Sequence, residues 1–278
     1  MNTLIVPVQT PVLKKHIQYF IFFSHDLNSA FSYTTFPNTN LCLAIYKENE
    51  IRYANGKHEN ECTVIHNSKT FSSRLFGFHE QPFKVNILSR LQQVCILFHP
   101  GGLRAFSAIP YAELMGQSNV FDLIFKNNGH FPEQLFEMDS VQKKAALLED
   151  FLLKSLKDNT HNSAVKFAIE QIHQKSGDIS VRNLSQTLGI NESTLYRKFD
   201  AFLGQSPKDF IQTVRFRKAL SLFLNHPVQN LTSLCYDAMF YDQSHFIKDF
   251  KKRAGLLPGT FNKNIQVEQG TLAWSVNN

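Results

Sequence analysis

Residues 184–199 read LSQTLGINESTLYRKF and residues 234–250 read LCYDAMFYDQSHFIKDF, so one pattern occurs twice near the end of this 278-residue chain. The positions that match are Leu184, Leu188, Gly189, Leu195, Phe199, Gly204, Pro207 and Phe210 in the first repeat, and Leu234, Ala238, Met239, Phe246, Phe250, Gly255, Pro258 and Phe261 in the second. The offset is 50 residues up to Met239 and 51 from Phe246 onward, so the second repeat has one extra residue at its turn. A helix, a tight turn and a second helix are the parts of a helix-turn-helix.

The first repeat has a well-specified turn and a polar outer face. Gly189 can adopt the left-handed conformation of a tight turn, and Asn191 can cap the helix that follows. Leu195 and Phe199 are four residues apart and form a buried stripe. The side chains left to face outward are Ser193, Thr194, Tyr196 and Arg197. On the second helix of a helix-turn-helix such side chains can reach the bases of DNA, so we expect these four to contact it. Because arginine can bond guanine bidentately in the major groove, we expect Arg197 to read a base.

The second repeat has a more basic face. Phe246 and Phe250 form its stripe and Asp242 is its expected cap. The residues expected to face DNA are Gln243, Ser244, His245 and Lys248. Glutamine can pair with adenine, and the lysine and arginine side chains can compensate phosphates, which extends the expected contacts to Lys251, Lys252 and Arg253. We therefore expect the first repeat to discriminate sequence and the second to add phosphate affinity.

Charge and cysteine usage agree with an intracellular DNA-binding protein. The formal net charge is +6, and residues 160–278 have 14 basic and 9 acidic residues, against 15 and 14 in residues 1–159. The four cysteines form no CxxC pair, which favours a reducing compartment. No secretory segment or membrane-spanning run is recognised, so a soluble, cytoplasmic protein is expected.

The region from about Ser163 to Phe261 resembles the DNA-binding domain of AraC/XylS-type transcription regulators. The resemblance rests on residues 184–199, the sequence GQSP at 204–207, DQSHF at 242–246, FKK at 250–252 and GLLP at 255–258. It implies seven helices, with two recognition helices held by a long connecting helix so that they enter successive major grooves. The family usually has glycine where this chain has Met239, so the second turn must accept a side chain, either by strain or by a different turn.

The first hundred residues predict an antiparallel β domain. Short runs of β-branched and aromatic residues give candidate strands at Ile17–Phe23, Leu41–Tyr46, Ile51–Ala54, Thr63–His66, Ser73–Phe78, Val85–Ser89 and Gln93–Phe98. Lys47–Glu50 is expected to connect a hairpin, and Asn55-Gly56 to form a second turn. Helices are expected after His99-Pro-Gly-Gly102: a short one near Leu103, then Phe131–Met138 and Val141–Leu156, the last capped by Asp139 or Ser140. The segment around residues 98–103 also resembles the N-terminal domain of one subset of these regulators, which implies a sensor or dimerisation module.

The predicted fold class is therefore α+β. A β-rich sensor or dimerisation domain with a helical tail is assigned to residues 1–158, a linker to 159–163, an all-α domain with two helix-turn-helix repeats to 164–265, and a C-terminal tail to 266–278. Within the all-α domain, Ala164–Gln174 is the expected first helix, and the long connecting helix is expected to begin near Pro207.

Motifs for catalysis or metal binding are weak. His58, His66, His79 and His99 with Glu80 lack a metal-ligand spacing, and no nucleophile elbow is present. Phe20, Phe22, Phe76 and Phe98 could line an apolar ligand pocket, but plain core is the favoured interpretation. We expect no enzyme activity, no metal and no cofactor.

The sequence predicts a sequence-specific DNA-binding transcription regulator. Double-stranded DNA is the expected partner, with RNA polymerase, a small-molecule effector and a second copy of the chain as further ones, and no membrane. Two alternatives stay open: an enzyme with an accessory DNA-binding domain, and a constitutive DNA-binding protein whose N-terminal half only dimerises.

Overall fold

The computed structural model describes residues 2–26, 30–53, 60–126, 130–157, 163–225, 231–258, 265–268 and 272–277. It divides into two compact units, which are described separately. We call Met1–Phe31, Asn40–Gly77 and Val85–His161 the β unit, and Ser32–Thr39, Phe78–Lys84 and Asn162–Asn278 the helical unit. The fold class is α+β, as predicted, but two short segments of the N-terminal half group with the helix-turn-helix repeats.

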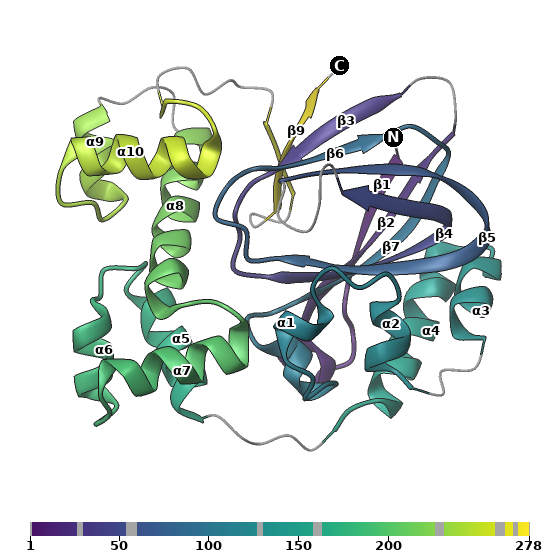
Figure 1. The fold of residues 1–278 in the computed structure, drawn as a ribbon, viewed down its shortest axis with the longest axis horizontal. Coiled ribbons are helices and arrows are strands. Elements are labelled where there is room, and N and C mark those ends of the chain that lie inside the picture. Colours follow the sequence, from purple (N-terminus) through teal and green to yellow (C-terminus); the bar gives the residue numbers. More distant parts are fainter. Residues whose placement is uncertain are drawn as a thin grey trace. The chain divides into compact units, whose positions relative to one another are not determined.

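The β unit is built on an antiparallel sheet (Figure 1). The strands are, in spatial order, β1 (Asn2–Pro7), β2 (Ile17–His25), β7 (Leu91–Phe98), β4 (Leu41–Tyr53) and β5 (Glu61–Gly77), followed by β6 (Phe83–Ile87), whose first two residues belong to the helical unit. Central strands carry the buried side chains, including Phe20, Phe22 and Phe98. These phenylalanines are part of the core, which is where the sequence favoured placing them.

Strand β4 corrects one prediction. Lys47–Glu50 does not connect a hairpin, because β4 runs without a break from Leu41 to Tyr53 and pairs with β5 over both halves. The register with β5 shifts between Lys47 and Asn49, and Glu48 lies between them at a φ of 55°. The polar residues there form a β-bulge, which bends a strand without ending it. The predicted turn at Asn55-Gly56 lies outside the described residues.

The His99-Pro-Gly-Gly102 segment ends β7, as predicted, and leads into the 3-10 helix η2 (Gly102–Ala105). Gly101 has a φ of 75°, and a Cβ on Gly102 would lie 2.0 Å from the carbonyl oxygen of His16. Both glycines are therefore required by the local backbone. Burial lowers the pKa of the neighbouring His99.

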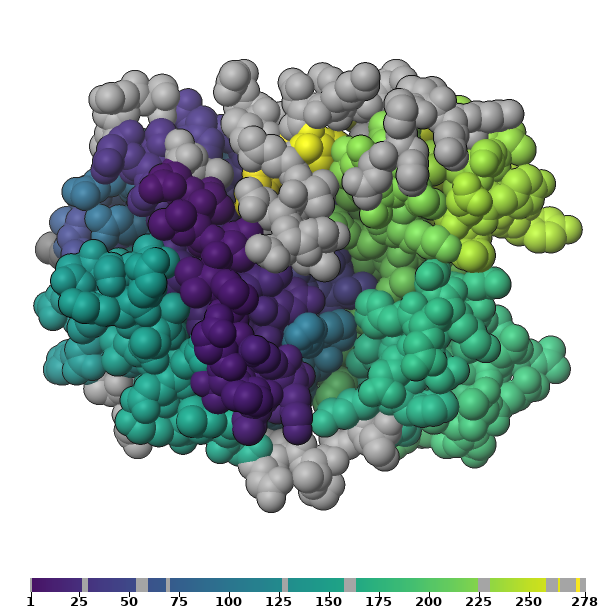
Figure 2. Space-filling model, turned by 180° about the vertical axis from the view of Figure 1, so that it is seen from behind, coloured from purple at the N-terminus to yellow at the C-terminus, as the bar shows by residue number. Residues whose placement is uncertain are grey.

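The described residues of the β unit also form four α-helices: α1 (Tyr111–Leu114), α2 (Val120–Ile124), α3 (Phe131–Glu137) and α4 (Val141–Lys154). Ser140 is the cap of α4, since its side chain accepts from the Lys143 N–H. Residues at the start of the chain lie against α4, and Glu149 accepts the N–H groups of Gln9 and Thr10, both at 2.8 Å (Figure 2).

The helical unit has six α-helices in its described residues: α5 (Ser163–Gln174), α6 (Val181–Thr187), α7 (Glu192–Leu203), α8 (Pro207–Asn225), α9 (Leu231–Asp237) and α10 (Gln243–Ala254). Within this unit, α8 joins the group α5 to α7 to the pair α9 and α10 (Figure 1). Pro207 begins α8, as predicted.

The segment assigned to a C-terminal tail contains strands. β9 (Leu272–Asn277) pairs with β8 (Ile265–Glu268) on one side and with residues of β3 (Phe31–Thr35) on the other. Phe36, which follows β3, is buried in the core of the second repeat with Phe246 and Phe250. The linker predicted at 159–163 falls on undescribed residues except for Ser163, where α5 begins.

Candidate nucleic-acid interface

The turns of the two repeats have the same geometry. The φ of Gly189 is 63° and that of Met239 is 62°. In the first repeat, Gly189 N–H bonds the Gln186 carbonyl at 3.1 Å and Ile190 N–H bonds that of Ser185 at 3.0 Å. In the second, the equivalent bonds are Met239 to Tyr236 at 2.9 Å and Phe240 to Cys235 at 3.0 Å. Of the two options that the sequence left open at Met239, the structure therefore has the strained one.

Both recognition helices begin at the predicted caps. The Asn191 side chain accepts from the Thr194 N–H at 2.7 Å at the start of α7, and the Asp242 side chain accepts from the His245 N–H at 2.7 Å at the start of α10. The cap fixes where the helix starts and therefore which side chains lie in its first turn.

Tyr241 is the extra residue of the second repeat. Ile190 and Asn191 are consecutive, whereas Phe240 and Asp242 have Tyr241 between them. Its side chain is 93% exposed, directly before the α10 cap. The change of offset from 50 to 51 marks this position in the sequence, but Tyr241 is not among the site residues predicted above.

Helix α7 presents the predicted polar face. Leu195 and Phe199 are completely buried, while Ser193, Tyr196 and Arg197 are exposed and Thr194 is partly buried. The Arg197 guanidinium lies 3.4 Å from the Thr194 hydroxyl oxygen, one turn back along the helix. This face can offer Arg197 to a base edge with little rearrangement.

Tyr196 has a second environment besides solvent. Its side chain lines a polar cavity of about 230 Å³ within the helical unit, together with Asp200 of α7, Asp209 of α8 and residues Phe78 to Glu80. This neighbourhood was not predicted, because Phe78–Glu80 is more than 100 residues away in the sequence.

Helix α10 presents the second polar face. Phe246 and Phe250 are completely buried, as the stripe predicts. Six of the predicted contact residues of this helix are exposed: Gln243, Ser244, His245, Lys248, Lys251 and Lys252. The His245 ring also meets the Phe240 ring edge-on, with centroids 5.6 Å apart.

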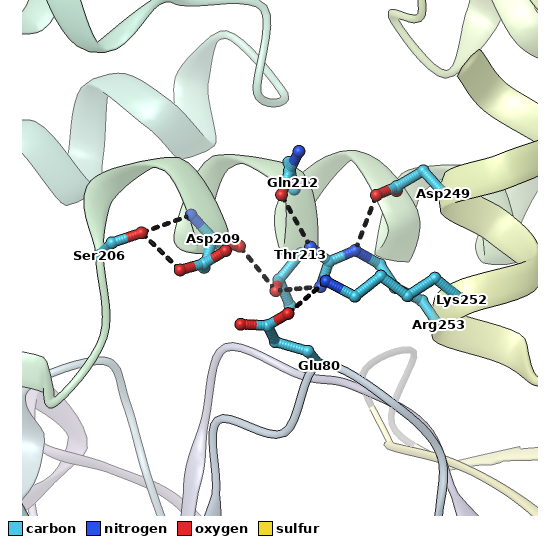
Figure 3. A network of polar contacts seen from close by, with 8 residues as sticks. All are labelled: Glu80, Ser206, Asp209, Gln212, Thr213, Asp249, Lys252 and Arg253. Atoms are coloured by element: carbon cyan, nitrogen blue, oxygen red, sulfur yellow. Dashed lines mark hydrogen bonds and ion pairs between the residues drawn. The ribbon is translucent and has the colours of Figure 1, made fainter.

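Two residues at the end of α10 have protein partners (Figure 3). The Lys252 ammonium forms an ion pair with the Glu80 carboxylate. Arg253 is completely buried and its guanidinium bonds Asp249, Thr213 and Gln212. The expectation that Arg253 compensates a phosphate is therefore wrong. Helical periodicity accounts for this burial, since Arg253 lies three residues after Phe250 and seven after Phe246, on the buried side of α10.

The segment Phe78–Lys84 contacts both repeats. Phe78 packs against the core of the first repeat, and Pro82 lies close to Gly255 at the end of α10. His79 stacks on Phe83 with ring centroids 5.4 Å apart, and burial lowers its pKa to about 4. The imidazole of His79 is therefore neutral near pH 7.

Other kinds of site have little support in the described part of the chain. No group of three or more histidine, cysteine, aspartate or glutamate side chains could hold a metal ion there. Among the same residues, no helix is long and apolar enough to cross a membrane.

Comparison with known proteins identifies the C-terminal part. Residues 184–264 match the family described as helix-turn-helix domain, and residues 9–119 match a domain of unknown function (DUF6597). The Msm operon regulatory protein of Streptococcus mutans is 32% identical over 127 residues, which cover 44% of this chain and 45% of that protein. An uncharacterized HTH-type transcriptional regulator of Haemophilus influenzae is 26% identical over 121 residues, covering 44% and 39%. The chain thus spans less than half the length of these curated relatives.

A solved structure similar to this chain is ToxT from Vibrio cholerae, with 14% identity and a TM-score of 0.45 over 88% of this chain and 97% of that one. The family match and the two capped repeats have the clearer meaning: residues 184–264 form a DNA-binding helix-turn-helix domain of the AraC/XylS type.

Proposed function

We propose that this protein is a sequence-specific transcription regulator in which α7 and α10 enter successive major grooves of one DNA duplex. The observation that carries the proposal is the repetition of one turn, with matching hydrogen bonds and matching φ values, before two capped helices with exposed polar faces. Recognition helices contact base edges mainly through their N-terminal residues. Both capped ends place polar side chains there.

We assign different duties to the two helices. Arg197 reads a base in the first groove, supported by Ser193, Thr194 and Tyr196. In the second groove Gln243 reads a base beside Ser244 and His245, and the phosphates are contacted by Lys248, Lys251 and Lys252. Tyr241 joins this second set, because its exposed phenol lies where α10 enters the groove and can donate to a phosphate oxygen.

The remaining assignments rest on the relatives and on the fold. We propose that the N-terminal half acts as a sensor for a small-molecule effector or as a dimerisation module, and not as an enzyme. The DNA-bound protein then recruits or occludes RNA polymerase in the cytoplasm. The relatives named above support this role, since both are regulators by name.

Selection of bound sequences from a random DNA pool tests the proposal. We expect enriched sequences to contain two short conserved blocks whose centres are about 10 base pairs apart, because adjacent major grooves on one face are one helical turn apart. A single conserved block, or no enrichment, would contradict two-groove recognition.

A further inference from the structure

The second recognition helix is joined to the connecting helix by a buried guanidinium. Arg253 of α10 has no exposed surface and bonds three side-chain oxygens (Figure 3). Its Nε donates to Asp249 Oδ1 at 3.2 Å within α10, while its two terminal nitrogens donate to Thr213 Oγ1 at 3.1 Å and Gln212 Oε1 at 3.0 Å on α8. Both helices therefore supply partners to one planar group.

The polar contacts continue toward the first recognition helix. Thr213 Oγ1 donates to the Asp209 carbonyl at 2.8 Å, and the Asp209 N–H donates to Ser206 Oγ at 3.1 Å. Ser206 lies two residues after Gly204, the left-handed residue that ends α7. A series of hydrogen bonds thus runs from Ser206, which the chain joins to the end of α7, along α8 to Arg253 on α10.

The hydrogen bonds of Arg253 constrain the orientation of α10 on α8 more than apolar packing would. The guanidinium is a rigid planar fork, and a buried charge is stable only while its hydrogen bonds keep good geometry. A rotation or shift of α10 along α8 would break the bonds to Gln212 and Thr213. The apolar contacts of Phe250 with Phe216, whose ring centroids are 5.6 Å apart, tolerate such a shift more readily.

One carboxylate oxygen of the network is left without a partner. Asp249 is buried, and its second carboxylate oxygen, Oδ2, has no hydrogen-bond partner within the described residues. Replacing a buried ion pair by apolar residues of similar volume is often neutral or stabilising. Stability alone therefore gives little reason for a charged cluster at this position.

We propose that Arg253 is a positioning residue that sets the angle and distance between α7 and α10, and thereby the half-site spacing that the domain accepts. The inference rests on the proposed function, because spacing has a meaning only if both helices read DNA. It assigns spacing selectivity to a residue that touches no DNA.

Binding to DNA with altered spacing tests the proposal. The selected two-block DNA is compared with versions in which the spacer is lengthened or shortened by one base pair, and with DNA that has only one block. For the wild-type chain we expect each altered spacer to weaken binding by about 10-fold or more, because one helix must then leave its groove.

The principal variant removes the ion pair as a unit, Arg253→Met with Asp249→Leu, so that no buried charge is left unpaired. We expect its loss on altered spacers to shrink to about threefold or less, with affinity for one-block DNA unchanged within about twofold. Thr213→Val is the second variant, since it removes one acceptor with almost no change of shape, and it should shift spacing preference in the same direction. Ile172→Val is the matched control, because Ile172 is buried in the core of the first repeat and is not one of the residues that form the hydrogen bonds described above.

The outcomes separate the two claims. Spacing preference that is flattened in both network variants and kept in Ile172→Val supports the inference. The network variants could instead lose affinity equally on every spacer, by an amount that matches their loss of stability in thermal unfolding. Arg253 would then have only a structural role, and the inference would be wrong while the proposed function stands. If the wild-type chain selects no two-block DNA, the proposed function fails first and the inference fails with it.

Discussion

At the scale of single residues, Met239 shows a conflict between sequence and turn geometry. The turn requires a left-handed residue, and the position is occupied by methionine at a φ of 62°. The left-handed conformation costs a residue with a side chain roughly 1–2 kcal/mol. Glycine would remove this cost, but its greater freedom in the unfolded chain would offset part of the gain in stability. We expect Met239→Gly to raise the free energy of unfolding by about 1 kcal/mol in denaturant titration.

Gly189 provides the reciprocal experiment in the first repeat. Nothing lies within 4 Å of a Cβ built on Gly189, so Gly189→Ala puts a side chain on a left-handed residue without a steric clash. It should lower the free energy of unfolding by about 1 kcal/mol. If Met239→Gly lowered stability as well, the packing of the methionine side chain would outweigh the strain.

Arg197 carries the prediction of direct base reading. Arg197→Ala should weaken binding to the selected DNA by about 1–3 kcal/mol and binding to random DNA by much less, because bidentate bonds to guanine exist only at the right base. Arg90→Ala is the control for the lost charge, since Arg90 is exposed in the β unit and pairs with Asp26. Equal losses on both DNAs in a titration would remove Arg197 from the base-reading set.

At the scale of elements, local patterns predicted what local interactions determine. The helix-turn-helix repeats were located by caps, glycine and apolar spacing, all of which act within a few residues, and Asn191, Asp242 and Pro207 have their predicted places. The hairpin connection predicted at Lys47–Glu50 is wrong because a β-bulge and a hairpin turn contain similar residues. The difference depends on pairing with β5, more than a dozen residues later. The phosphate contact predicted for Arg253 is wrong because Arg253 was given the exposed environment of the neighbouring lysines.

The lysines in the last turn of α10 are predicted to supply charge without sequence preference, beside the base contact assigned to Gln243 at its start. Lys251→Met should lower affinity nearly uniformly across DNA sequences and reduce the slope of log affinity against log salt by about 0.9, since one phosphate contact is lost. Lys143→Met removes the same charge from α4, where Lys143 pairs with Asp139, and should leave the slope unchanged. An unchanged slope for Lys251→Met would show that Lys251 is a solvated charge.

At the scale of the whole molecule, the N-terminal half supplies structure to the DNA-binding domain that no local pattern could reveal. Residues Ser32–Thr39 and Phe78–Lys84 group with the helical unit, where Phe36 and Phe78 join the cores of the two repeats. Such contacts span more than 100 residues of sequence. Because they depend on tertiary packing, the domain boundaries predicted along the sequence could not include them.

The stability of the helical unit should depend on pH through His79, which lies in the Phe78–Lys84 segment. Its pKa is lowered by burial from 6.5 to about 4, so the unfolded chain binds the proton first. The stabilisation is complete above pH 6.5 and is lost as the pH falls toward 4, by about 1–2 kcal/mol after allowance for partial solvent exposure. His79→Gln cannot be protonated. The difference in free energy of unfolding between wild type and His79→Gln should therefore change between pH 7 and pH 5, and a constant difference would contradict the assignment.

The pair Glu80–Lys252 links the Phe78–Lys84 segment to DNA affinity. While Lys252 is paired with a carboxylate, its net attraction for a phosphate is reduced, and surface pairs of this kind contribute about 0–1 kcal/mol. Glu80→Gln should therefore strengthen DNA binding by a few-fold and steepen its salt dependence, more than Glu113→Gln, which removes a carboxylate from α1 of the β unit.

A double-mutant cycle with Lys252→Met isolates the effect. In the Glu80→Gln background, loss of Lys252 should cost more affinity than it does in the wild type, because the lysine then acts on the phosphate alone. Equal costs in the two backgrounds, measured at one salt concentration, would mean that the ion pair is broken before DNA binds and that Glu80 has no influence on the interface.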